Sequence, residues 1–128
     1  MSIFNAIGVA GTGVTVHRKW LDAISDNLAN MDNASRTSEN AFQAKYIVAR
    51  EAQDGVEVGG VAVGSAEGRL VYEPSHPLAD AEGYVRYPDI DMGSQMAQMI
   101  MAQRGYQANL AVVDRARESY TAAINLGR

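Results

Sequence analysis

The stretch IFNAIGVAGTGVTVHRKWLDAISDNLANM, residues 3–31, decides the fold. One set of its residues recurs at alternating spacings of four and three, and His17 is the only polar member of that set. We call the set the N-terminal seam: Ile3, Ile7, Ala10, Val14, His17, Leu21, Ile24, Leu28 and Met31. This heptad spacing predicts a helix over about residues 2–31 that packs on another helix along the seam.

Glycine weakens the front half of this predicted helix. Gly8, Gly11 and Gly13 each cost about 1 kcal/mol relative to alanine in a helix interior. Their spacing matches neither the Walker phosphate loop nor the dinucleotide fingerprint, and no strand precedes them. We therefore interpret the glycines as positions where another backbone approaches closely, and we expect the front half to need a packing partner.

The end of the chain repeats the four-three rhythm and predicts a second helix over about residues 93–126. Asp91 is expected to cap its first turn, and Gly127 is expected to close its last turn. We call its apolar positions the C-terminal seam: Met92, Met96, Met99, Tyr106, Leu110, Val113, Tyr120 and Ile124.

The middle of the chain has the short alternating patterns of strands. Strands are predicted over about residues 45–51, 69–73 and 84–87, and valines around Gly59-Gly60 predict either two short strands or one bent strand. The sequence therefore predicts an α+β fold in which two long terminal helices pack as a coiled-coil-like pair around a small β-rich insert. The predicted segments are residues 1–31, 32–91 and 92–128.

The composition excludes several classes of function. A net charge of −4 without clustered basic residues argues against nucleic acid as a partner. The chain contains no cysteine, which removes disulfides and thiolate chemistry. It has no run of about 20 apolar residues, so we expect no membrane insertion. The start of the chain lacks a basic region ahead of an apolar stretch, so we expect no cleaved signal peptide.

The residues with chemical potential are better explained by structure. The two histidines, His17 and His76, have no spacing that requires a metal site, and His17 is expected to be a packed polar residue of the seam. Acidic side chains between residues 80 and 91 suggest no positioned nucleophile or cleft. The methionines near residue 96 are interpreted as adaptable packing rather than a copper site. We predict no catalytic residue, no cofactor and no metal.

Several motifs resemble those of flagellar rod and hook proteins. LDAISDNLAN at residues 21–30 is similar to the N-terminal signature of that superfamily, and RGYQAN at 104–109 is similar to its C-terminal signature. Between them, LVYEPSHPLAD at 70–80 and GYVRYP at 83–88 resemble the middle of the FlgC family of proximal rod proteins. The motifs occur in the family's order and extend over nearly the whole chain, so chance explains them poorly.

The resemblance implies a structural subunit of the bacterial flagellar basal-body rod, which spans the periplasm and transmits torque. The implied partners are other copies of the chain, rod proteins of the FlgB, FlgF, FlgG and FliE types, and the type III export apparatus that would deliver the chain uncleaved. Two other functions stay open: a cytoplasmic helical homo-oligomeric adaptor, and a small enzyme.

Seam residues and polar residues of the signatures make up the predicted assembly interface. It consists of Ile3, Ile7, Val14, Leu21, Ile24, Asn27, Leu28, Asn30, Met96, Met99, Arg104, Tyr106, Gln107, Asn109, Leu110, Val113, Tyr120 and Ile124. Asn27 and Asn30 are expected to bond backbone groups of the following loop or of a neighbour. Arg104, Gln107 and Asn109 are expected to lie beside the C-terminal seam and to select the orientation of the contact.

Overall fold

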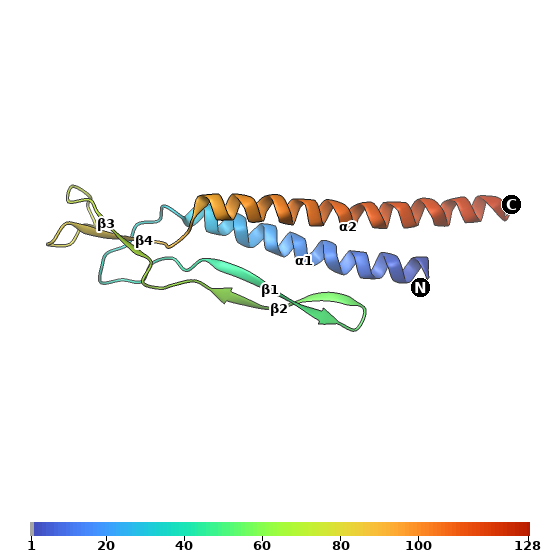
Figure 1. The fold of residues 1–128 in the computed structure, drawn as a ribbon, viewed down its shortest axis with the longest axis horizontal. Helices are drawn as coiled ribbons and strands as arrows, with labels where there is room; N and C mark the ends of the chain where they lie inside the picture. Colours follow the sequence, from blue (N-terminus) through green and yellow to red (C-terminus); the bar gives the residue numbers. More distant parts are fainter. Residues whose placement is uncertain (1) are drawn as a thin grey trace. The chain divides into compact units, whose positions relative to one another are not determined.

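A computed structural model describes residues 2–128 of the chain and confirms the α+β prediction. One long helix precedes the four strands in the sequence and a second long helix follows them (Figure 1). The elements are α1 (Ile3–Asn30), β1 (Lys45–Ala52), β2 (Gly55–Val63), β3 (Arg69–Tyr72), β4 (Tyr84–Tyr87) and α2 (Met92–Leu126). Both helices begin and end within one residue of the predicted bounds.

Short-range hydrogen bonds set the ends of the helices. The Ser2 hydroxyl accepts the Asn5 N–H at 3.1 Å at the start of α1. The Asp91 carboxylate accepts the Ser94 N–H at 2.7 Å, which confirms the predicted cap of α2. At the other end, the Gly127 N–H donates to the carbonyl of Ala123 at 3.3 Å. These bonds satisfy backbone groups that a helix end leaves without partners.

The described chain divides into two compact units, and each long helix contributes residues to both. The first unit contains residues 2–21, 47–60 and 99–128, and the second contains Asp22–Tyr46 and Val61–Gln98. The predicted division of the chain into segments 1–31, 32–91 and 92–128 stays a prediction.

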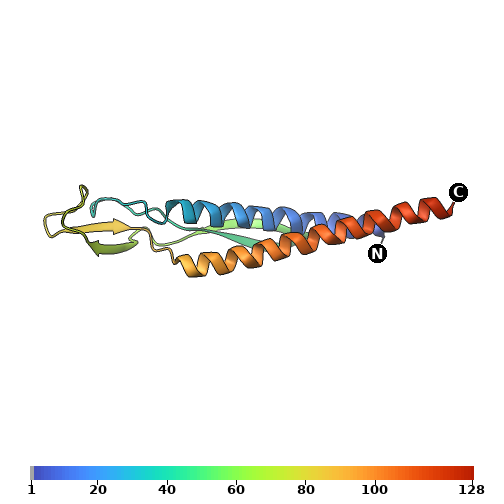
Figure 2. The same ribbon diagram turned by 90° about the horizontal axis from the view of Figure 1, so that it is seen from above.

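In the first unit, α1 and α2 lie side by side and antiparallel, and the β1–β2 hairpin lies alongside α1 (Figures 1 and 2). The rings of Phe4 and Tyr120 meet edge to face, with centroids 5.3 Å apart. The hairpin turns at residues 53 and 54, and Gly55 follows with a positive φ of 134°. β2 then runs without interruption through Gly59 and Gly60, so the valine pattern forms one strand.

In the second unit, β3 and β4 form an antiparallel pair in which Val71 lies opposite Val85. Val85 is fully buried and belongs to the core of this unit. Gly68 has a positive φ of 59°, and a Cβ atom there would collide with the Tyr87 carbonyl. The guanidinium of Arg86 donates to the carbonyl of Thr37 at 2.8 Å, which ties the loop after α1 to β4.

A carboxylate organises the turn between β3 and β4. Asp80 Oδ1 accepts the backbone N–H of Tyr84 at 2.8 Å and that of Glu82 at 3.1 Å. The hydrogen bond from Tyr84 is the main reason that the pKa of Asp80 lies below its ordinary value. The turn is therefore stabilised by the ionised form of this side chain.

Candidate assembly interface

The contact between α1 and α2 in the first unit is made by glycines that face polar side chains. The amide of Asn109 lies too close for Gly13 to carry a Cβ atom, since its Oδ1 is only 2.7 Å from the position that this atom would take. In the same way, a Cβ atom on Gly105 would collide with the imidazole of His17. The two helices approach each other closely at these points because neither glycine carries a side chain.

Both polar side chains also bond backbone carbonyls in the contact. His17 Nδ1 donates to the carbonyl of Gly13 at 2.8 Å, and Asn109 Nδ2 donates to the carbonyl of Gly105 at 2.8 Å. Each glycine therefore sits beside the polar side chain of the opposite helix and accepts a bond from a side chain of its own helix. The prediction that His17 is a packed polar residue of the seam is confirmed.

The Thr12 hydroxyl attaches the β1–β2 hairpin to α1. It donates to the carbonyl of Val9 at 2.7 Å and accepts the backbone N–H of Val56 at 3.1 Å. A Cβ atom on Gly55 would collide with this hydroxyl, so the close approach requires glycine at the start of β2. The hydroxyl uses its single donor and one acceptor site, and both bonds run to backbone groups.

In the second unit, Asn27 joins α1 to the start of β1 and to α2. Its Oδ1 accepts the Lys45 N–H at 2.7 Å, and its Nδ2 donates to the Lys45 carbonyl at 2.9 Å. The same Nδ2 donates to Gln95 Oε1 at 3.1 Å. Asn27 is completely buried and Gln95 is 2% exposed, so the bond between their side chains forms away from water, while the two bonds to Lys45 are partly buried. The prediction that Asn27 bonds the backbone of a following segment is confirmed.

Asn30 makes only local bonds. Its Nδ2 donates to the carbonyl of Asp26 at 2.8 Å and to the Asp26 carboxylate at 3.3 Å, all within α1. Asp26 also forms an ion pair with Lys45 at 2.5 Å. In the described chain, the Asn30 side chain therefore bonds its own helix, while its backbone carbonyl accepts the N–H of Asn33 in the following loop at 3.1 Å.

The residues of the predicted assembly interface differ widely in exposure. Two are buried, namely Ile24 and Asn27. Nine are half-buried, namely Ile7, Val14, Leu21, Leu28, Asn30, Met99, Tyr106, Asn109 and Val113. Seven are exposed, namely Ile3, Met96, Arg104, Gln107, Leu110, Tyr120 and Ile124. The buried and half-buried groups serve packing inside the chain, whereas the exposed group remains available to partners.

The C-terminal seam is only partly the face of α2 that is buried within the chain. Gln95 and Ala102 are buried, although neither belongs to the predicted seam, which has Met96 one residue after Gln95. Asn109 was predicted to lie beside the C-terminal seam; within the chain its amide lies against Gly13 in the helix contact, and its role between subunits stays a prediction. Small and polar side chains allow a closer approach than the methionines and leucine of the seam.

The interpretation of the glycines as close-packing positions is supported at Gly13, which lies against Asn109. Within the chain, Gly8 and Gly11 have open space around them, so close approach at these two glycines stays a prediction. The contacts at Thr12 and Gly105 were missed by sequence reasoning. Gly105 lies inside the RGYQAN motif, and a glycine within a helical pattern is a signal of close packing that could have identified it.

Two specific features are absent from the described residues. Across residues 2–128, no group of three or more His, Cys, Asp or Glu side chains is placed to hold a metal ion. None of the helices in that range is sufficiently long and apolar to cross a membrane.

Comparison with known proteins places the chain in a family. It is 36% identical to the flagellar basal-body rod protein FlgC of Yersinia enterocolitica, and the similarity covers 100% of both chains. It is 34% identical over 100% of both chains to FlgC of Salmonella typhimurium, and 26% identical over 100% of both to FlgC of Bacillus subtilis. The chain belongs to the FlgC family.

A second family description matches the C-terminal part of this FlgC-family chain. The family described as "Flagellar basal body rod FlgEFG protein C-terminal" matches residues 81–126. That range contains β4 and α2, and therefore Gln95, Gly105 and Asn109. Residues 81–126, which match this second family, thus supply the α2 side of the contact between α1 and α2.

Proposed function

We propose that this FlgC-family chain is a structural subunit of the flagellar basal-body rod and not an enzyme. The observation that carries the proposal is the full-length similarity to proteins named as basal-body rod proteins. The fold supports it, since the two terminal helices pack through small and polar residues and leave apolar side chains exposed along their length. Exposed apolar side chains in this number mark surfaces for protein partners.

The subunit lies in the flagellar basal body and assembles with other rod components. Its partners are further copies of the chain, neighbouring rod proteins of the FlgB, FlgF, FlgG and FliE types, and the type III export apparatus during delivery. The chain leaves the cytoplasm without cleavage of a signal peptide. Its terminal helices become stably ordered on assembly. The assembled rod transmits torque across the periplasm. Glycine-weakened helices with apolar seams suit folding that is coupled to binding.

The exposed members of the predicted interface form the outer assembly surface. Met96 is 46% exposed, Leu110 is 40% exposed and Ile124 is 43% exposed, and all three belong to the C-terminal seam. Burying the part of each side chain that is still exposed contributes about 1 kcal/mol, since a whole side chain of this size contributes about 1.5–3 kcal/mol. Arg104 and Gln107 flank this surface and select the orientation in which neighbours bind.

The proposal is tested by replacing the gene with variants in the source bacterium and by isolating basal bodies. We expect deletion to abolish swimming, and we expect the wild-type chain in basal bodies to retain its intact N-terminal mass. Met96→Asp should abolish swimming, whereas Ala97→Asp, the matched control on a neighbouring exposed position, should preserve it. Swimming of the deletion strain, or confinement of the chain to the cytoplasm, would refute the rod and favour the adaptor.

A further inference from the structure

A groove in the first unit lies between α1 and β2. Its volume is about 310 Å³, and it is lined by Thr12, Thr15, Val16, Lys19, Val56, Glu57 and Val58. Among the lining residues, Val16 is buried, while Val58 is 36% exposed. The groove exists because the Thr12 hydroxyl holds the start of β2 against the helix at Val56. It is wide enough for one aliphatic side chain of a partner, since a leucine side chain is smaller than this volume.

The rim of the groove carries one uncompensated positive charge. Glu57 is neutralised by Arg50, whose Nε lies 2.6 Å from its carboxylate. Lys19 is exposed and makes no ion pair with any residue between 2 and 128. An occupant of the groove would therefore combine an apolar side chain with a carboxylate nearby.

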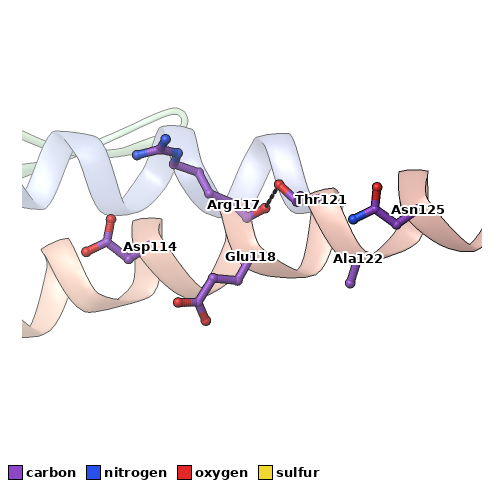
Figure 3. A pocket seen from close by; sticks show the side chains of 6 residues that line it. All are labelled: Asp114, Arg117, Glu118, Thr121, Ala122 and Asn125. Atoms are coloured by element: carbon purple, nitrogen blue, oxygen red, sulfur yellow. Dashed lines mark hydrogen bonds between the residues drawn. The ribbon is translucent and has the colours of Figure 1, made fainter.

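One exposed face of α2, also in the first unit, has this combination. Leu110 is 40% exposed, and Asp114 follows four residues later, so both lie on the same side of the helix. Glu118 follows one turn further, and Figure 3 shows Asp114, Arg117 and Glu118 projecting from α2. Neither carboxylate forms an ion pair in the described part of the chain. With two acids and Arg117, this face is negative by one charge.

We propose that the groove of one copy receives the α2 face of a second copy, with Leu110 entering the groove and Asp114 pairing with Lys19. The charges are complementary, and the apolar side chain matches the apolar lining. The inference rests on the proposed function, since it names which two surfaces of neighbouring copies meet in the rod.

The two surfaces are different parts of the molecule, so the contact is heterologous. A heterologous contact leaves a free groove on one copy and a free α2 face on the other, and it therefore propagates into a ring or an open helical array. A rod is an array of this kind. An isologous contact would instead stop at a dimer.

Disulfide trapping tests the contact, because the natural chain contains no cysteine. Thr15 lines the groove, and Gln107 is exposed one turn before Leu110 on the same side of α2. The double variant Thr15→Cys, Gln107→Cys is introduced in place of the natural gene, and isolated basal bodies are oxidised mildly. We expect a ladder of covalent dimers and larger species on a denaturing gel. Each single-cysteine variant should give monomers only.

The matched control is Thr15→Cys combined with Ser119→Cys. Ser119 is exposed and lies about 180° from Leu110 around the helix at 100° per residue, so it should give no ladder. Basal bodies that contain the double variant but give no more covalent dimer than this control would overturn the inference and leave the proposed function intact. Absence of the natural chain from basal bodies would instead refute the proposed function.

A charge exchange provides a second measurement that needs no cysteine. Lys19→Glu should reduce the number of complete basal bodies about fivefold, which corresponds to the largest contribution expected of one exposed ion pair. Asp114→Lys in the same chain should restore the number. Arg18→Glu, at the neighbouring exposed position that does not line the groove, should have little effect. Equal effects of Lys19→Glu and Arg18→Glu, with no rescue by Asp114→Lys, would contradict the pairing.

Discussion

The side-chain amide of Asn27 pairs with both backbone groups of Lys45, accepting its N–H at 2.7 Å and donating to its carbonyl at 2.9 Å. A buried asparagine near the end of a helix thus makes the two backbone hydrogen bonds that a neighbouring strand would otherwise make to Lys45, the first residue of β1. The second hydrogen of the same Nδ2 reaches Gln95 at 3.1 Å, so both donors and the oxygen of the amide are used.

Asn27→Leu should destabilise the assembled subunit by about 2–3 kcal/mol, because it leaves the buried amide oxygen of Gln95 and the partly buried backbone groups of Lys45 without partners. The measurement is the temperature at which the chain dissociates from isolated basal bodies. Asn30→Ala is the control, since the Asn30 side chain bonds only the preceding turn of its own helix, and it should shift this temperature much less. Equal shifts for the two variants would show that the Lys45 bonds contribute little.

Thr12→Val should loosen the hairpin from α1, because valine keeps the shape of threonine but removes the acceptor for the Val56 N–H. The expected loss is about 1–2 kcal/mol. The measurement is amide hydrogen exchange of peptides containing Val56 in isolated basal bodies. Thr15→Val is the matched control, because the Thr15 hydroxyl bonds only the carbonyl of Gly11 in its own helix. Faster exchange in both variants, or in neither, would count against the role of Thr12.

Gly105→Ala should weaken the helix contact, because the added methyl group collides with the imidazole of His17. We expect fewer complete basal bodies and slower swimming. Combining Gly105→Ala with His17→Ala should recover part of the loss, which a double-mutant cycle would report as coupling.

Gly8→Ala is the control for this pair, since nothing in the described chain lies within 4 Å of the added atom and alanine favours helix by about 1 kcal/mol. It should leave assembly unchanged or improve it. A strong defect from Gly8→Ala would instead indicate that a neighbouring subunit approaches α1 at that glycine.

Asp80 should make the stability of the chain depend on pH. Its pKa is lowered on folding from an ordinary value of 3.8, mainly by the hydrogen bond from Tyr84. The stabilisation is therefore present above 3.8 and is lost as the pH falls through the lowered pKa of the folded state. Melting temperatures of the full chain at pH 7 and at successively lower pH values measure this effect.

Asp80→Asn keeps an oxygen that can accept the Tyr84 N–H but removes the charge. This variant should lose less melting temperature on acidification than the natural chain. Identical pH profiles for the two chains would show that the charge on Asp80 is not linked to folding.

The pattern of apolar residues was sufficient to predict the secondary structure. The spacing of Ile3, Ile7 and Val14 predicted α1, and the alternation around Val56 and Val58 predicted a strand. Ile24 was predicted to be a packing residue and is 1% exposed. Side chains that repeat with the period of a helix or a strand share one face, and the sequence contains that information directly.

The detail of the helix contact could not be predicted in this way. Asn109 was expected to lie beside the C-terminal seam, but its contact with Gly13 was not predicted; that contact uses small residues that allow a close approach. Periodicity identifies residues that share a face, but it does not identify which of two neighbouring faces meets the other helix. That choice depends on the shape of the partner's surface.

By itself, the sequence determined the two long helices, the positions of the strands and, through its motifs, the family. Local period, capping residues and short signatures are properties of neighbouring residues, so no tertiary information was needed. The tertiary structure alone decided that Asn27 pairs with Lys45, that Thr12 holds Val56, and that Leu110 remains exposed. The two hydrogen bonds join residues that are distant in the chain, and the exposure of Leu110 depends on which residues pack against it. Hydrogen bonding and close packing can decide such contacts only after folding has brought the backbones together.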